Sequence, residues 1–278
     1  MLKTRIITAI GLVSVFLLAL FYLPPIGWLS FSTLVAALAG WEWGALIGIG
    51  QRARVSLGIA VVTVSVITAF AAPNAVGIGT YSLASATTLG QWFYFPSIFF
   101  WLAIVPLWLK FRWRISNTLI GTAVGSVVIL PTWLALIQIR QVGEFALLAL
   151  MATVWLADIA AYFSGRRFGR RKLAPAISPG KTWEGAVGGV LAVIVYGFLF
   201  LSVLPSALAE NKTLLFGLLV AFAALSIVGD LFESLLKRQA GLKDSSSILP
   251  GHGGVLDRID SLTLTLPIVA TALHHFSL

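Results

Sequence analysis

Apolar stretches of bilayer length recur along almost the whole chain. A helix needs about 20 mostly apolar residues to cross the hydrocarbon core of a membrane. Nine stretches meet this requirement: 5–23, 27–48, 55–72, 93–109, 116–137, 145–163, 186–203, 212–235 and 261–277. We therefore expect an all-α polytopic integral membrane protein with about nine transmembrane helices. Residues 1–278 should form a single helical membrane domain, in which spans within 1–140 precede spans within 145–278.

The scarcity of charge supports this expectation. Only 10% of the 278 residues are charged and 59% are apolar, whereas soluble domains carry about 25% charged residues. The chain has no cysteine, which excludes disulfides, thiolate zinc sites and a cysteine nucleophile. Segment 73–92 has no charged residue and is rich in Gly, Ser and Thr. It is compatible with a loop, an interfacial stretch or a re-entrant piece.

The basic residues predict the orientation. If the N-terminus is cytoplasmic and the spans alternate, all of the 19 Lys and Arg residues except Arg140 and Lys212 fall on the cytoplasmic side, as the positive-inside rule requires. The two largest polar segments, 164–185 and 236–260, then share that side. The net charge of +9 therefore reflects membrane topology, and we expect no nucleic-acid partner.

Charged residues inside the apolar stretches are the strongest sign of function, because a central Asp costs about 2.5–3.5 kcal/mol to insert. Asp158 lies near the cytoplasmic end of the sixth stretch, and Asp230 and Glu233 lie in the eighth. Asp230, Ser234 and Lys237 share one helical face, with Glu233 close to it. This face could hold a cation and a phosphate together. Alternatively, Asp230 and Lys237 could form an internal ion pair.

The loop 239–254 that follows is rich in glycine and serine and ends in Gly-His-Gly-Gly. Its glycines let backbone N–H groups approach a ligand, and Arg238 and Lys243 add positive charge for phosphates. Asp257 and Asp260 come next, three residues apart at the start of the last stretch. One carboxylate would suffice as a helix cap, whereas two that face one point indicate a magnesium site.

The other cytoplasmic loop contains Gly180-Lys181-Thr182, which mimics the end of a phosphate-binding P-loop. The required earlier glycine is replaced by Pro175 and no strand is expected before it, so we reject a P-loop. Ser178, Lys181 and Thr182 instead precede a helix, whose N-terminus favours the phosphates of a nucleotide. Glu42, between Trp41 and Trp43, is interpreted as a buried group that is hydrogen-bonded or protonated rather than catalytic.

The stretch 234–260 resembles the pattern of the phosphatidate cytidylyltransferase family. The matching residues are Ser234, Lys237, Arg238, Lys243, Asp244, Ser246, Pro250, His252, Gly253, Gly254, Asp257, Arg258 and Asp260. The segment from Asp158 through Lys172 and Lys181 to Gly185 is also similar to the family, as is Trp41-Glu42-Trp43. The resemblance extends over the whole length.

This resemblance implies a nucleotidyltransferase in the bacterial cytoplasmic (inner) membrane. The implied reaction converts CTP and phosphatidate into CDP-diacylglycerol and pyrophosphate, with Mg²⁺, a further monovalent cation and a homodimer. Asp230, Asp257 and Asp260 are the expected metal ligands, and together with Lys237 and His252 the expected catalytic residues. The expected substrate-binding residues are Lys172, Ser178, Lys181, Thr182, Ser234, Arg238, Lys243, Asp244 and Arg258.

Two other functions compete with this one. In a membrane transporter, intramembrane carboxylates would line a route across the bilayer, but here the charged groups gather at one face. CDP-alcohol phosphotransferases begin their motif with Asp-Gly, whereas Asp158 is followed by Ile159. Both functions remain as alternatives.

Overall fold

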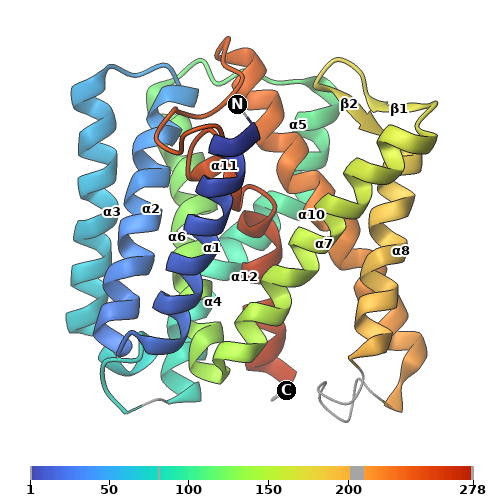
Figure 1. Cartoon of the computed structure of the whole chain (residues 1–278). Coiled ribbons are helices and arrows are strands. Elements are labelled where there is room, and N and C mark those ends of the chain that lie inside the picture. The colour runs from blue at the N-terminus through green and yellow to red at the C-terminus, as the bar shows by residue number, and fades with distance from the viewer. Residues whose placement is uncertain (1, 81, 201–209, 277–278) are drawn as a thin grey trace.

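The structure is a computed structural model that describes residues 2–80, 82–200 and 210–276. It is almost entirely helical, as expected (Figure 1). The α-helices are α1 Leu2–Tyr22, α2 Pro25–Leu46, α3 Gln51–Ala71, α4 Leu83–Phe99, α5 Val105–Phe111, α6 Thr118–Val142, α7 Glu144–Phe168, α8 Trp183–Leu199, α10 Lys212–Gln239, α11 Leu256–Ile259 and α12 Leu262–Phe276. The exception to an all-α fold is a small antiparallel hairpin, β1 Lys172–Ala174 and β2 Ser178–Thr182.

Six helical segments of the described chain are long and apolar enough to cross a membrane, which fits a multi-pass membrane protein. They are Lys3–Tyr22, Gln51–Ala71, Leu83–Phe111, Thr118–Val142, Glu144–Phe168 and Lys212–Gln239. The apolar helices Trp183–Leu199 and Leu262–His274 are shorter. The segments that meet both the length and the hydropathy of a membrane span are therefore six among the described residues, fewer than the nine expected from the sequence.

The main difference in boundaries concerns segment 73–92. Only its first part is a connection, which contains the 3₁₀ turn η1 Pro73–Ala75. Helix α4 already begins at Leu83 rather than at residue 93, because Ser82 caps it by accepting a hydrogen bond from the Ser85 N–H. The buried amide of Gln138 in α6 donates to the carbonyls of Ala75 and Ala86 and so fixes the connection against the bundle. Residues 201–203 and 277 of the expected spans lie outside the described residues.

Proline sets two local features. Pro25 opens α2 directly after Pro24, because its fixed φ suits the first turn and its missing N–H needs no partner there. Between α4 and α5 the helix widens into a π turn, η2 Phe100–Ile104, just before Pro106. Proline cannot donate to the preceding turn, which explains why the regular ladder is interrupted at this point.

Helix α6 is the central helix, and about two-thirds of its apolar stretch is buried. The indoles of Trp28 and Trp43 in α2 donate to the α6 carbonyls of Leu136 and Gly121. Figure 1 shows α2 and α3 on one side of the bundle and α7, α8 and α10 on the other. The N-terminus, the β1–β2 hairpin and α11 lie at one end, and the C-terminus lies at the opposite end. The two polar segments therefore share one end of the molecule, as expected.

Candidate active site

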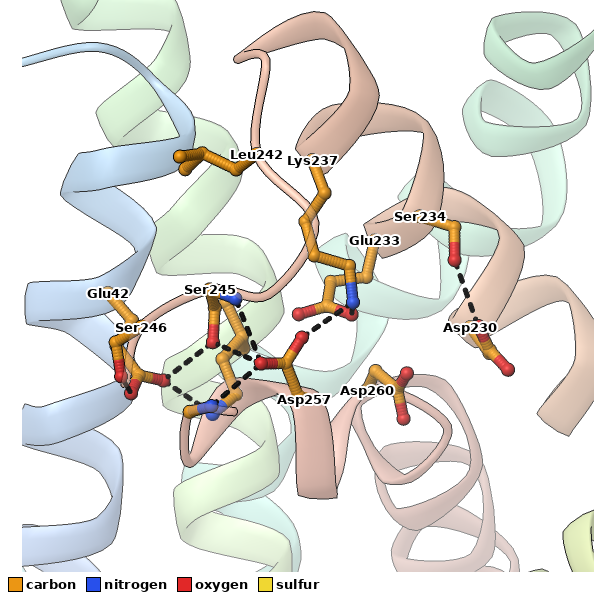
Figure 2. A network of polar contacts seen from close by, with 12 residues as sticks. Glu42, Asp230, Glu233, Ser234, Lys237, Leu242, Ser245, Ser246, Asp257 and Asp260 are labelled. Carbon is orange, nitrogen blue, oxygen red and sulfur yellow. Dashed lines mark hydrogen bonds and ion pairs between the residues drawn. The ribbon is translucent and has the colours of Figure 1, made fainter. Parts of the chain in front are cut away.

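Lys237 lies at the centre of a buried charge network near the end of α10 (Figure 2). Its ammonium group donates to Glu233 Oε2 at 2.5 Å and to Asp257 Oδ1 at 2.6 Å. All three side chains are buried. The alternative ion pair between Asp230 and Lys237 is therefore wrong: Glu233 occupies the i−4 position that favours pairing within a helix, and Asp257 comes from α11.

Asp257 organises the loop between α10 and α11. Its Oδ2 accepts hydrogen bonds from the Ser245 N–H at 2.8 Å, the Ser245 hydroxyl at 2.9 Å and the Gly254 N–H at 2.7 Å. Burial alone would raise the pKa of Asp257, but Lys237 and the N–H groups of Gly254 and Ser245 hold that pKa below its usual range. The Asp257 carboxylate is thus ionised, and each of its two oxygens accepts at least one hydrogen bond.

Gly253 is required by the same arrangement. Its φ is +81°, and a Cβ there would come within 2.5 Å of Asp257 Oδ2. A side chain at this position would be strained and would also collide with the carboxylate that holds the loop. The Gly-His-Gly-Gly sequence therefore permits the loop to close tightly around Asp257.

A second cluster lies on the face of α10 turned towards the hairpin. The ammonium group of Lys181 in β2 lies 2.5 Å from Asp230 Oδ2, and the Ser234 hydroxyl donates to Asp230 Oδ1 at 3.1 Å. Asp158 of α7 is close enough for its charge to interact with those of Asp230, Lys181 and Arg258. The structure therefore brings together three of the predicted site residues, Asp230, Ser234 and Lys181, and adds Asp158.

Asp260 lies between the two clusters, at the end of α11. One of its carboxylate oxygens accepts from the Ser261 N–H at 2.7 Å. Burial raises the pKa of Asp260 well above its usual range, and the negative charges of Asp230 and Glu233 raise it further. A Cβ on Gly229 would lie only 2.8 Å from the Asp260 carbonyl oxygen, so this glycine lets α10 approach the site closely.

Most of the remaining predicted substrate-binding residues are exposed. The side chains of Lys172, Arg238, Lys243, Asp244 and Arg258 are exposed, and Ser178 is half-buried. Thr182 is buried and caps α8, because its hydroxyl accepts from the Gly185 N–H at 3.1 Å. Its local role is therefore to begin the helix that follows the hairpin. The His252 Nδ1 atom is buried without a hydrogen-bond partner in the described part of the chain.

Two carboxylates of the site were not among the residues predicted to act. Glu233 is buried beside Lys237, and its Oε1 atom has no hydrogen-bond partner among the described residues. Its position four residues before Lys237 in the same helix was the sequence feature that could have predicted this ion pair. For Asp158 the sequence indicates only a charge that is costly to bury, without a role in the site. Glu42, interpreted as structural, is indeed buried and hydrogen-bonded.

The metal site expected at Asp230, Asp257 and Asp260 is not preassembled. No group of three or more His, Asp or Glu side chains in the described ranges is arranged to hold a metal ion without further ligands. Lys237 lies against Asp257 and Lys181 lies against Asp230. Lysine ammonium groups therefore provide the positive charge beside these two carboxylates.

Comparison with known proteins gives a consistent result. A model of the cytidylyltransferase family matches residues 3–276. The chain is 40% identical over 282 residues to the phosphatidate cytidylyltransferase of Pseudomonas aeruginosa, covering 98% of this chain and 97% of that protein. It is 54% identical over 127 residues to the enzyme of the same name from Haemophilus influenzae, covering 45% of this chain and 44% of that protein. It is 43% identical over 133 residues to the phosphatidate cytidylyltransferase of Thermotoga maritima, covering 46% of this chain and 49% of that protein.

Proposed function

The chain belongs to the cytidylyltransferase family, and on this basis we propose that it is a phosphatidate cytidylyltransferase, which makes CDP-diacylglycerol and pyrophosphate from CTP and phosphatidate. The observation that carries the proposal is the match to the Pseudomonas aeruginosa enzyme over 98% of the chain. The polar clusters around Lys237 and Asp230 support it, because they gather acidic and basic groups at one end of an otherwise apolar bundle.

The proposed chemistry is a displacement at the α-phosphorus of CTP. A phosphate oxygen of phosphatidate forms the new bond to that phosphorus, and the bond to the bridging oxygen breaks as pyrophosphate leaves. A phosphate monoester is already a nucleophile, so no side chain has to attack. The protein then acts by positioning the two phosphates and neutralising their charge.

Basic side chains of the two polar segments supply that charge. We assign the exposed Lys172, Arg238, Lys243 and Arg258 to substrate phosphates, because these cations belong to the two polar segments that share one end of the bundle. Lys181 can reach the same region from the hairpin, where it now pairs with Asp230. Ser178 and Thr182, which flank it, support the hairpin at the start of α8. Asp244 and His252 belong to the loop, and His252 is a candidate for contact with pyrophosphate.

The donor set at the site suits Mg²⁺. Magnesium usually takes one or two carboxylates and completes its shell with waters and substrate phosphates. Asp230 and Asp260 are close enough for their charges to act on each other, and such a pair favours a cation. Asp257 is the third proposed ligand, next to Lys237. Bound Mg²⁺ would supply positive charge to the triphosphate and the leaving pyrophosphate. A monovalent cation is a further part of the proposal.

We extend the proposal to the membrane. Helices α2, α8 and α12 would add three spans to the six long apolar segments and so give nine. Nine spans would place the N-terminus and both polar segments in the cytoplasm and the C-terminus outside. The asymmetry of Lys and Arg supports this orientation. The protein would then lie in a bacterial inner membrane, with CTP entering from the cytoplasm and phosphatidate from the bilayer. A homodimer is proposed from the family resemblance alone.

One assay tests the proposed function directly. Purified protein in detergent micelles is supplied with phosphatidate, Mg²⁺ and CTP labelled in its α-phosphate, and the lipid products are separated. The label should appear in CDP-diacylglycerol, with one pyrophosphate released for each lipid formed. Equal transfer from ATP and GTP would contradict the assignment of the nucleotide. Absence of a labelled lipid with every nucleotide would contradict the activity itself.

A further inference from the structure

Glu42 of α2 binds the loop between α10 and α11 from a distant part of the sequence. Its side chain is fully buried. Oε1 accepts from the Ser246 hydroxyl at 2.6 Å and the Val255 N–H at 2.9 Å. Oε2 accepts from the Leu256 N–H at 2.6 Å and the Ser245 hydroxyl at 3.2 Å. Four donor groups of one loop therefore converge on one carboxylate, and the single proton of the Ser245 hydroxyl is shared between Glu42 and Asp257.

These four donors come from the two ends of the loop. Residues 245–246 follow its first turn (Figure 2), and residues 255–256 lie where α11 begins. Between them, Gly254 leaves no room for a side chain, because a Cβ would meet the Ser245 hydroxyl and Glu42 Oε1. Glu42 thus closes residues 245–256 into a ring, and Asp257 directly follows this ring in the chain.

The ring is coupled to the charge network through Ser245. Its hydroxyl lies 2.9 Å from Asp257 Oδ2 and 3.2 Å from Glu42 Oε2, so one side chain connects the two carboxylates. Asp257 in turn holds Lys237. In the described structure no Lys, Arg or His forms an ion pair with Glu42. Hydrogen-bond donors of the loop alone compensate this buried carboxylate, which makes the loop's conformation depend on it.

We infer that Glu42 is a positioning residue, which holds the 245–256 loop so that Asp257 and Lys237 stay in place for phosphoryl transfer. The inference rests on the proposed function for its kinetic consequence, whereas the effect on the loop does not depend on it. Glu42 touches none of the reacting groups that we assign; it acts through Ser245 and the backbone N–H groups of Val255 and Leu256.

Glutamine is the informative substitution. The Val255 N–H points at one carboxylate oxygen and the Leu256 N–H at the other. In Glu42→Gln one of these acceptors becomes an NH₂ group, so in either orientation an N–H faces another N–H. The substitution preserves size and shape, and it removes one acceptor that the loop needs. Ser246→Ala is a milder variant, because it removes a single donor to Glu42 and leaves Ser245 untouched.

The absence of cysteine permits a readout independent of activity. A cysteine introduced at the exposed Ser247 carries a nitroxide spin label, and its electron paramagnetic resonance spectrum reports the mobility of the loop. Glu144→Gln is the matched control, since Glu144 is partly exposed and begins α7 at the other end of the bundle. All variants are made in the Ser247→Cys background, in micelles, and their melting temperatures are recorded.

We expect Glu42→Gln to sharpen the spectrum and to lower kcat about tenfold to a hundredfold, the scale of a misplacement of about 1 Å. The KM for phosphatidate should change less than threefold, and Glu144→Gln should resemble the parent. Ser246→Ala should shift both readouts in the same direction by less. An unchanged spectrum in Glu42→Gln, or in Ser246→Ala if the former does not fold, would overturn the inference. So would unchanged kcat in an active parent. If the parent makes no CDP-diacylglycerol, the proposed function fails and the spectra alone decide the role of Glu42.

Discussion

The ammonium group of Lys181 lies 2.5 Å from a carboxylate oxygen of Asp230, although the first residue belongs to the β1–β2 hairpin and the second to the middle of α10. This ion pair joins the first polar segment, 164–185, to α10, the helix that leads into the second polar segment. Both partners are about one-quarter exposed, so a substrate phosphate or a metal ion can compete for either of them.

Removal of the Lys181 charge should weaken nucleotide use. In Lys181→Met, Asp230 loses its counter-charge and the triphosphate loses a donor, and we expect kcat/KM for CTP to fall about tenfold to a hundredfold. Steady-state kinetics with varied CTP measure this. Lys212→Met is the control, because Lys212 begins the same helix at its other end. Equal losses in both variants would show that the effect is not specific to the site.

A methyl group at Gly254 should disrupt the loop. The Cβ of Gly254→Ala would overlap the Ser245 hydroxyl and Glu42 Oε1, and overpacking of this kind typically costs about 1–3 kcal/mol. We expect a lower melting temperature in micelles together with loss of activity. Gly217→Ala is the matched control, because a Cβ there meets nothing within 4 Å and alanine favours a helix. A Gly254→Ala protein as stable and active as the parent would contradict the close packing around Glu42.

The proposed orientation predicts opposite labelling of two single cysteines. Ser247→Cys, in the loop between α10 and α11, should react with an impermeant maleimide only when the cytoplasmic face is accessible. Thr80→Cys, in the connection before α4, should react from outside in intact cells. The lack of native cysteine makes each label specific. Reaction of Ser247→Cys from outside would reverse the topology.

The sequence was sufficient to predict the helical membrane class and the residues near the site, because apolar length and the cost of buried charge act locally. It could not predict the partners. Lys237 has Asp230 and Glu233 on nearby faces of its own helix, and the choice of Glu233 and Asp257 depends on how the loop folds. The start of α4 was misplaced for a related reason. In the sequence alone, Ser82 is typical of a loop, and it can act as a helix cap only when the turn that follows it is helical.

The hydrogen-bond donors to Glu42 could not be predicted from the sequence either. Two of the four are backbone N–H groups, of Val255 and Leu256, which carry no residue-specific signal. A glutamate between two tryptophans therefore indicated burial but gave no indication of the loop that it binds.

The rate of CDP-diacylglycerol formation by Asp257→Asn tests the central claim most directly, namely that the carboxylates between α10 and α12 act in cytidylyl transfer. Asparagine keeps the size of aspartate while it removes the charge beside Lys237. The variant should insert normally and lose at least about a hundredfold in rate, the order of one strong electrostatic contact. Excess chelator should abolish CDP-diacylglycerol formation by the parent enzyme, and added Mg²⁺ should restore this activity. If Asp257→Asn kept most of its activity, or if chelation left the parent unaffected, the proposed metal site would be wrong.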